Sequence, residues 1–260
     1  MKGRVLIIAG SDSGGGAGIQ GDIKTVSALG GYAMTAITAI TVQNTMAVSD
    51  VHPVPAHIIA AQMRVVMDDI GADAIKTGML HDEDVILTVV DFLNNQAKQI
   101  PAVIDPVMIS KSGNPLLQAN AINALKKKLL PLATLMTPNI PEAETMLGMP
   151  ITDMNDAARA LSQFGCKAVL LKGGHAAGEI ITDVLWDGRE ITQWQNPRIH
   201  SQHTHGTGCT LASAIAVSLG QGMPLKDSIT RARDYVMGAI KNAPGYGHGH
   251  GPLNHSWNQN

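Results

Sequence analysis

Short apolar runs alternate with segments of helical periodicity along most of the chain, a pattern typical of buried strands joined by helices. The apolar runs predict strands over residues 4–10, 33–42, 73–78, 101–106, 133–139 and 167–174. The periodic segments predict helices over residues 17–29, 55–69, 82–96, 119–130, 153–164, 209–219 and 224–240. Two-residue alternation over 180–194, around the turn sequence DGRE, predicts a β-hairpin.

This order of elements indicates the fold class. Strands separated by helices of such length form a parallel sheet with right-handed crossovers and helices on both faces. The sequence has no linker, low-complexity tract or charge run that would divide it. We therefore expect an α/β fold with a mostly parallel central sheet, formed as a single domain over residues 1–260.

Composition narrows the class of protein. Hydrophobic residues make up 45% of the 260 residues but aromatic residues only 3%, so the core must be aliphatic. A net charge of −2 with scattered Lys and Arg argues against nucleic-acid binding. No apolar stretch reaches the ~18 residues of a membrane span, and the first apolar run lacks the basic flank of a signal peptide. Two distant cysteines fit a reducing compartment, so we expect a cytoplasmic protein.

Ligands of such folds bind beyond the carboxyl ends of the strands, where this chain places polar loops. The first loop, AGSDSGGGAGIQGDIKT, matches neither the dinucleotide fingerprint nor a Walker A loop, and a structural role suits it as well as a ligand site. Asp22 could face this loop, although an isolated acid is more often a surface residue. After the second strand, the Gln43 amide suits the edge of a heteroaromatic ring, whereas turn formation explains Asn44 equally well.

Three later loops offer groups suited to a metal ion or a phosphate. Asp105 ends a strand, where it could support Mg²⁺ or cap a turn. Asn139 and Glu142 stand three residues apart at the start of a helix; spacing alone favours a capping pair over oxygen ligands for hydrated Mg²⁺. Lys172 could place a charge against a phosphate, but a lone lysine is weak evidence.

The segment HGTGCTLASAIA is the most distinctive. It places the backbone N–H groups of Gly206, Thr207, Gly208 and Cys209 at the start of a helix, which makes an anion site. The same field lowers the pKa of a thiol placed there, so Cys209 reads as an activated group. Cys166, just before a buried strand, reads as a small core residue.

Several segments in order resemble one family. IAGSDSGGGAGIQGDIKT, AITAITVQNT, IKTGML, DPVMISKSG, TPNIPEA, LLKGGH and HGTGCTLASAIA resemble the hydroxymethylpyrimidine/phosphomethylpyrimidine kinases of thiamine biosynthesis. The resemblance extends from about Val5 to His255, essentially the whole chain. It implies a ribokinase-like three-layer sandwich. It also implies two ATP-dependent phosphorylations, first of 4-amino-5-hydroxymethyl-2-methylpyrimidine and then of its monophosphate.

The resemblance also implies roles for individual residues. Gly206, Thr207, Gly208 and Cys209 would form the anion hole at the transferring phosphate, and Cys209 would be the base of the first step. Mg²⁺ would be organised by Asp105 and Glu142 through water, and ATP would be bound by Lys172, Asn139 and Thr207. The pyrimidine would contact Gln43, Asp22, Gly18, Met79 and Val107.

Other interpretations stay open at this point. A pyridoxal kinase of the same superfamily phosphorylates a similar hydroxymethyl heteroaromatic. A ligand sensor without activity, or a thiol hydrolase using Cys209 with His205, belongs to another class. His203 and His205 could tune Cys209 or simply be polar loop residues. The tail residues His248, His250 and His255 favour a loop that closes near the nucleotide over a metal site, and we expect a homodimer.

Overall fold

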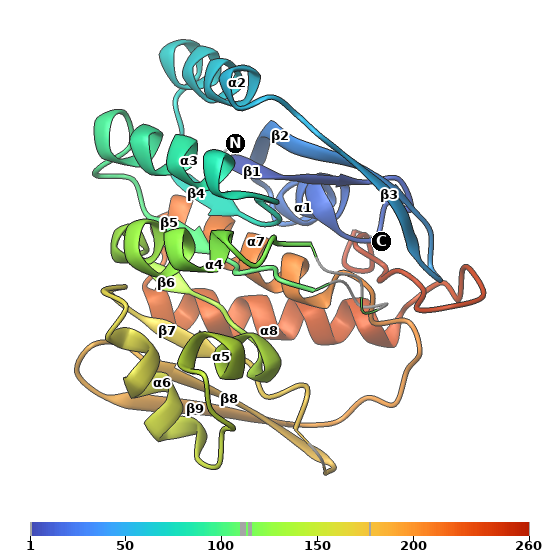
Figure 1. Cartoon of the computed structure of the whole chain (residues 1–260). Helices are drawn as coiled ribbons and strands as arrows, with labels where there is room; N and C mark the ends of the chain where they lie inside the picture. Colours follow the sequence, from blue (N-terminus) through green and yellow to red (C-terminus); the bar gives the residue numbers. More distant parts are fainter. Residues whose placement is uncertain (1, 110–112, 114–115, 177, 260) are drawn as a thin grey trace.

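The computed structural model describes residues 2–109, 113, 116–176 and 178–259 (Figure 1). Residues 110–112 and 114–115, in the segment that follows Asp105, lie outside the described residues. The strands are β1 Arg4–Asp12, β2 Tyr32–Gln43, β3 Val48–Pro53, β4 Ala74–Thr77, β5 Ala102–Ile104, β6 Leu135–Met136, β7 Val169–Leu171, β8 Ile180–Trp186 and β9 Ile191–Pro197. The α-helices are α1 Gly18–Ala28, α2 Ala56–Asp69, α3 Glu83–Asn95, α4 Ala121–Ala124, α5 Ile140–Leu147, α6 Met154–Ser162, α7 Thr207–Gly220 and α8 Leu225–Lys241.

One sheet runs through the molecule in the order β3-β2-β1-β4-β5-β6-β7-β8-β9. Its central strands, β2 to β7 in that order, pair in parallel. β3 is antiparallel at one edge, and the hairpin β8–β9 is antiparallel at the other. The α/β fold with a mostly parallel sheet and a hairpin is therefore confirmed.

Helices cover both faces of this sheet, which makes three layers (Figure 1). β1 shows why, because its side chains alternate between two hydrophobic clusters. Val5, Ile7 and Ala9 pack with α1, α7 and α8, whereas Leu6 and Ile8 pack with the cluster under α2 to α6. A strand that is apolar on both faces must be central and buried, as its sequence predicted.

The helix expected over 119–130 differs in the structure. α4 is followed by a π-helical turn, Leu125–Leu129, and a 3₁₀ turn, Leu130–Leu132. Pro131 lacks the N–H that a continuing α-helix would need. The wider turn also lets Leu125, Leu129 and Leu130 all face the core.

Strand β3 was not predicted. Its exposed Ser49, Asp50 and His52 give it the composition of a loop, because an edge strand needs few apolar residues. β5, β6 and β7 are shorter than their apolar runs, and each ends just before a polar residue of the site described next. Within the described residues, no helix is long and apolar enough to span a membrane.

Candidate active site

A cavity of about 1090 Å³ opens at the carboxyl ends of the parallel strands. All but one of the predicted site residues line it: Gly18, Gln43, Met79, Asp105, Val107, Asn139, Glu142, Lys172, Gly206, Thr207, Gly208 and Cys209. The residue that is missing from its lining is Asp22. Segments that are up to about two hundred residues apart in the chain therefore converge on one site, as parallel strands with polar loops lead us to expect.

The anion turn, Gly206–Cys209, begins α7. Gly206 is the N-cap and has a left-handed φ of 85°. A Cβ at this position would lie 1.9 Å from the Gly16 carbonyl oxygen, so only glycine fits. In this described stretch no backbone acceptor takes the N–H groups of Gly208 and Cys209. Donors of this kind at a helix N-terminus suit a phosphate, and the anion site stays a prediction.

The expected lowering of the Cys209 pKa is wrong. Burial raises the pKa of the Cys209 thiol to about 11; the charge of Lys76 opposes the rise, and the carboxylates of Asp22 and Asp105 add to it. The cost of removing a thiolate from water is the largest of these effects. Cys209 is therefore a neutral thiol at pH 7. Cys166 is a buried core residue, as expected.

Three ionisable side chains meet beside the anion turn. Lys172 Nζ lies 2.9 Å from Asp105 Oδ1, which also accepts a hydrogen bond of 3.0 Å from Thr137 Oγ1. A Cβ at Gly208 would be 3.3 Å from Lys172 Nζ, so the lysine reaches the start of α7. Burial raises the pKa of Glu142 to about 7, with Lys172 opposing the rise and Asp105 adding to it.

Asn139 and Glu142 form a capping box at the start of α5. The Asn139 N–H donates to Glu142 Oε2 at 2.8 Å, and the Glu142 N–H donates to Asn139 Oδ1 at 2.9 Å. The capping interpretation is thus confirmed, and it does not conflict with a second role. The box holds the Glu142 carboxylate at the cavity wall, where Asp105 and Lys172 also lie.

The donor set of this site suits a hydrated Mg²⁺. Asp105 and Glu142 supply carboxylate oxygens, and an ionised Glu142 gives the cluster more negative charge than Lys172 balances. Two carboxylates are a small donor set: across the described ranges, no metal site could be formed by three or more His, Cys, Asp or Glu side chains. Mg²⁺ commonly keeps several waters and relies on phosphate oxygens, so such a sparse set fits it.

Glu142 should make folding stability depend on pH. Its usual pKa of 4.5 rises to about 7 on folding, so the folded state binds the proton more tightly. The free energy of unfolding should therefore fall by about 3 kcal/mol as pH rises from 4.5 to 7, and no further above that. Urea unfolding at several pH values would test this. Glu142→Gln should remove the fall and the exposed Glu83→Gln should retain it; parallel curves for wild type and Glu142→Gln would refute the assignment.

Asp22 lies behind the cavity, which corrects the expectation that it contacts the pyrimidine. Its carboxylate is fully buried and accepts hydrogen bonds from Lys76 Nζ at 2.8 and 2.9 Å and from Ser213 Oγ at 2.7 Å. Burial would lower the pKa of Lys76, but the negative charges of Asp22 and Asp105 outweigh it and raise the pKa. Asp22 thus supports Lys76, which lines the cavity.

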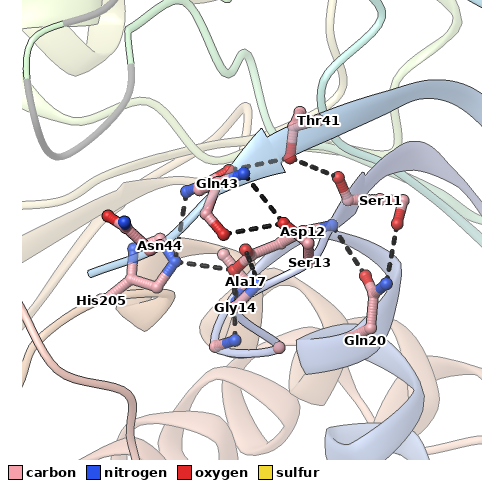
Figure 2. Close-up of polar contacts among 12 residues, drawn as sticks. Ser11, Asp12, Ser13, Gly14, Ala17, Gln20, Thr41, Gln43, Asn44 and His205 are labelled. Carbon is pink, nitrogen blue, oxygen red and sulfur yellow. Dashed lines mark hydrogen bonds and ion pairs between the residues drawn. The ribbon is translucent and has the colours of Figure 1, made fainter. Parts of the chain in front are cut away.

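The glycine-rich loop, residues 13–17, is organised by Asp12 (Figure 2). Asp12 accepts hydrogen bonds from the N–H groups of Gly14 at 2.8 Å, Gly16 at 3.1 Å and Ala17 at 2.8 Å. At the end of the loop Gly18 has a φ of 53°, and a Cβ there would lie 2.5 Å from the Gly10 oxygen. This tight turn brings the backbone to the cavity wall.

Gln43 and Asn44 have separate roles. Gln43 ends β2 and lines the cavity, and its backbone is tied to Ser13 by hydrogen bonds of 2.7 and 2.8 Å (Figure 2). Asn44 Oδ1 accepts from the N–H groups of Met46 and Ala47, which confirms the turn interpretation. Met79 and Val107 line the same cavity as Gln43, and Met79 is only 8% exposed.

A family model described as phosphomethylpyrimidine kinase matches residues 12–254. The chain belongs to the phosphomethylpyrimidine kinase family. The resemblance seen in its motifs is therefore confirmed.

Individual relatives match the chain over almost its whole length. The thiamine biosynthesis bifunctional protein ThiED of Geobacter sulfurreducens is 49% identical over 257 residues, which are 98% of this chain but 52% of that protein. The chain thus spans about half of that relative. The hydroxymethylpyrimidine/phosphomethylpyrimidine kinase of Haemophilus influenzae is 47% identical over 260 residues, with 97% of this chain and 96% of that protein covered.

Solved structures of two kinds resemble this phosphomethylpyrimidine kinase family member. An ADP complex of Bacillus subtilis pyridoxal kinase has a TM-score of 0.91 and 36% identity, covering 100% of this chain and 99% of that one. The phosphomethylpyrimidine kinase of Clostridium difficile 630 has a TM-score of 0.81 and 42% identity, covering 92% and 100%. The ribokinase-like fold is confirmed by these neighbours.

The phosphomethylpyrimidine kinase motifs did not reveal Lys76 or the contact between Asp12 and His205. Lys76 could have been noticed as a lysine inside an otherwise apolar strand, since such a group must be paired when buried. His205 was noted as a residue that could tune Cys209, but its contact with Asp12 at 2.8 Å joins residues far apart in the chain and has no local signal. The tail was only partly foreseen. His250 lines the cavity, whereas His255 is buried, hydrogen-bonded to Thr210 at 3.1 Å, and its pKa falls to about 4 because of that burial.

Proposed function

We propose that this chain uses ATP to phosphorylate 4-amino-5-hydroxymethyl-2-methylpyrimidine and then to convert the monophosphate to the diphosphate, in thiamine biosynthesis. One observation carries the proposal. The anion turn, the Asp105–Lys172–Glu142 cluster and the apolar wall of Met79 and Val107 share one cavity. The relative from Haemophilus influenzae bears the name of this activity and matches nearly from end to end, which supports it.

The phosphate half of the cavity binds ATP in this proposal. Lys172 and the N–H groups of Gly208 and Cys209 neutralise the oxygens of the transferring phosphoryl group. Asn139 and Thr207 contact the other phosphates, and Asp105 and Glu142 would hold the waters of Mg²⁺. Mg²⁺ held there would supply positive charge that offsets the negative charge of the phosphate oxygens. The reaction needs little else from the protein, because phosphoryl transfer is chiefly positioning and charge stabilisation.

The acceptor half orients the pyrimidine. Gln43 faces a polar edge of the ring, Met79 and Val107 cover its face, and Gly18 lets the backbone approach. In the first step the Cys209 thiolate takes the proton of the hydroxymethyl group as its oxygen bonds to the γ-phosphorus, and the bond to ADP breaks. Only the thiolate can do this, so the high pKa of Cys209 limits this step. In the second step the acceptor is an ionised phosphate and needs no base.

The test compares acceptors. ADP release with Mg-ATP is measured with hydroxymethylpyrimidine, its monophosphate and pyridoxal at equal concentrations. We expect turnover of the first two and much slower turnover of pyridoxal. Turnover of pyridoxal alone would favour the second candidate, a pyridoxal kinase, which the TM-score of 0.91 to such an enzyme makes a specific rival.

We further propose a cytoplasmic homodimer whose chains each fold as one domain over residues 1–260. The sheet that continues from β3 to β9 supports a single domain. Cytoplasmic location suits the free thiols of Cys166 and Cys209. We place the interface between the two chains at β2 and the turn after it. These segments expose four large apolar side chains, each at least 48% accessible: Tyr32, Ile40, Val42 and Met46.

Ile40→Glu is expected to convert the dimer to a monomer. Ile40 and Val42 lie on the same exposed face of β2, and a buried unpaired carboxylate would oppose their contact across two chains. Light scattering at several concentrations would give the molar mass. Ile58→Glu, on exposed α2, should leave the mass unchanged. A monomeric wild type, or a dimeric Ile40→Glu, would contradict this interface.

A further inference from the structure

His205 joins three segments of the site. It immediately precedes the anion turn, and only 9% of it is exposed. Its Nε2 lies 2.8 Å from Asp12 Oδ2 and 3.4 Å from Gln43 Nε2 (Figure 2). Its backbone N–H donates to the Gly251 oxygen at 3.1 Å. The imidazole therefore contacts the ends of β1 and β2, and the backbone of the same residue is bonded to the tail, at the start of α7.

The Asp12 carboxylate decides which nitrogen of His205 carries a proton. Burial would raise the pKa of Asp12, but the hydrogen bonds from His205 and from the N–H groups of Ala17 and Gly14 outweigh it and lower the pKa. An ionised carboxylate only accepts hydrogen bonds. The proton between the two side chains must therefore lie on His205 Nε2.

This assignment leaves the Gln43 amide free to bind a ligand. A protonated Nε2 cannot accept a hydrogen bond, so the Gln43 N–H groups do not donate to His205. They remain available in the cavity that Gln43 lines. Without the imidazole, the vacated side of Asp12 Oδ2 would attract those same N–H groups, and Gln43 would turn away from the ligand.

The contact also fixes the distance between the two halves of the site. A Cβ on Gly16 would lie 2.6 Å from His205 Cδ2, and a Cβ on Gly206 would lie 1.9 Å from the Gly16 oxygen. The glycine-rich loop and the start of α7 are thus packed backbone against backbone. A shift of His205 toward the loop must move Gly16, because no space is left between Gly16 and the imidazole.

We propose that His205 is a positioning residue, which through Asp12 and Gln43 holds the acceptor-binding groups in register with the anion turn. The inference rests on the proposed function for the identity of the acceptor. It goes beyond that function, because it assigns to this imidazole the alignment of acceptor and phosphate rather than any proton transfer. Loss of His205 should therefore weaken acceptor binding much more than ATP binding.

The test uses the full chain with Mg-ATP. His205→Phe keeps a ring but removes the donor, and we expect the KM for hydroxymethylpyrimidine to rise about tenfold or more, the usual effect of leaving a buried charge unpaired. The KM for ATP should stay within about threefold, since among the described residues no hydrogen bond or ion pair joins the His205 side chain to Lys172, Asp105 or Glu142. His205→Gln, whose amide can still donate to Asp12, should restore most of the acceptor affinity.

His57→Phe, on exposed α2, is the matched control and should leave both constants unchanged. Thermal unfolding of each variant shows whether it folds. If His205→Phe does not fold, Asp12→Asn takes its place, with the same rise in the acceptor KM expected. A wild type that phosphorylates neither pyrimidine overturns the proposed function. An active wild type whose acceptor KM is unaffected in these variants, or rises no more than the KM for ATP, overturns the inference alone.

Discussion

Cys209→Ala is expected to lower kcat for phosphorylation of the alcohol by about 10²–10⁴-fold, the usual contribution of a general base. Phosphorylation of the monophosphate should change by less than about threefold, because its acceptor oxygen is already ionised near neutral pH. ADP release with each acceptor, at saturating Mg-ATP, measures both values. The loss is selective because Cys209 takes a proton only in the first step.

The pH profile gives this prediction a second readout. Because burial raises the pKa of Cys209 to about 11, the thiolate fraction rises about tenfold per pH unit below that value. From pH 7 to 9 the alcohol step should therefore accelerate with rising pH, while the monophosphate step stays nearly flat. Cys166→Ala, the matched thiol in the core, should change neither profile. Equal losses in both steps for Cys209→Ala would show that Cys209 is structural.

Gly206→Ala is expected to lower kcat of both steps by at least about 10²-fold, as the loss of an anion-binding donor does elsewhere. Its new Cβ would lie 1.9 Å from the Gly16 oxygen, so the anion turn has to move away from the glycine-rich loop. The N–H groups of Gly208 and Cys209 would then miss the transferring phosphate. Steady-state kinetics with both acceptors would measure the loss.

Gly222→Ala separates this effect from backbone strain. Gly222 has a φ of 86°, almost that of Gly206 at 85°, but a Cβ there meets nothing within 4 Å. Both variants should therefore lose about 1–2 kcal/mol of stability from left-handed backbone strain. Only Gly206→Ala should also lose activity. If the two variants keep the same activity, the close contact with Gly16 does not position the turn.

The sequence predicted most of the fold because the sheet is buried on both faces. Apolar runs of central strands such as β1 and β7 are continuous, so they stand out from the helices between them. The edge strand β3 lacks that signal. The polar ends of the strands also predicted where the cavity opens, since parallel strands deliver their loops to one edge.

Sequence spacing could not predict electrostatics that depend on burial. Asn139 and Glu142 were recognised as a pair because their spacing is local. The direction of the Cys209 pKa was missed, because the helix start is visible in the sequence while the surrounding burial is not. Asp22 was misplaced for a related reason: nothing near it in the sequence identifies Lys76, 54 positions away, as its partner.

The buried contact between Lys76 and Asp22 constrains how this chain can evolve. Either substitution alone leaves the remaining buried charge without a partner, which typically costs about 3–5 kcal/mol. Replacement of both by apolar residues of similar volume often costs far less. In sequences that diverge from this one, substitutions at positions 22 and 76 should therefore occur together. A change on β4 should be accompanied by a change on α1.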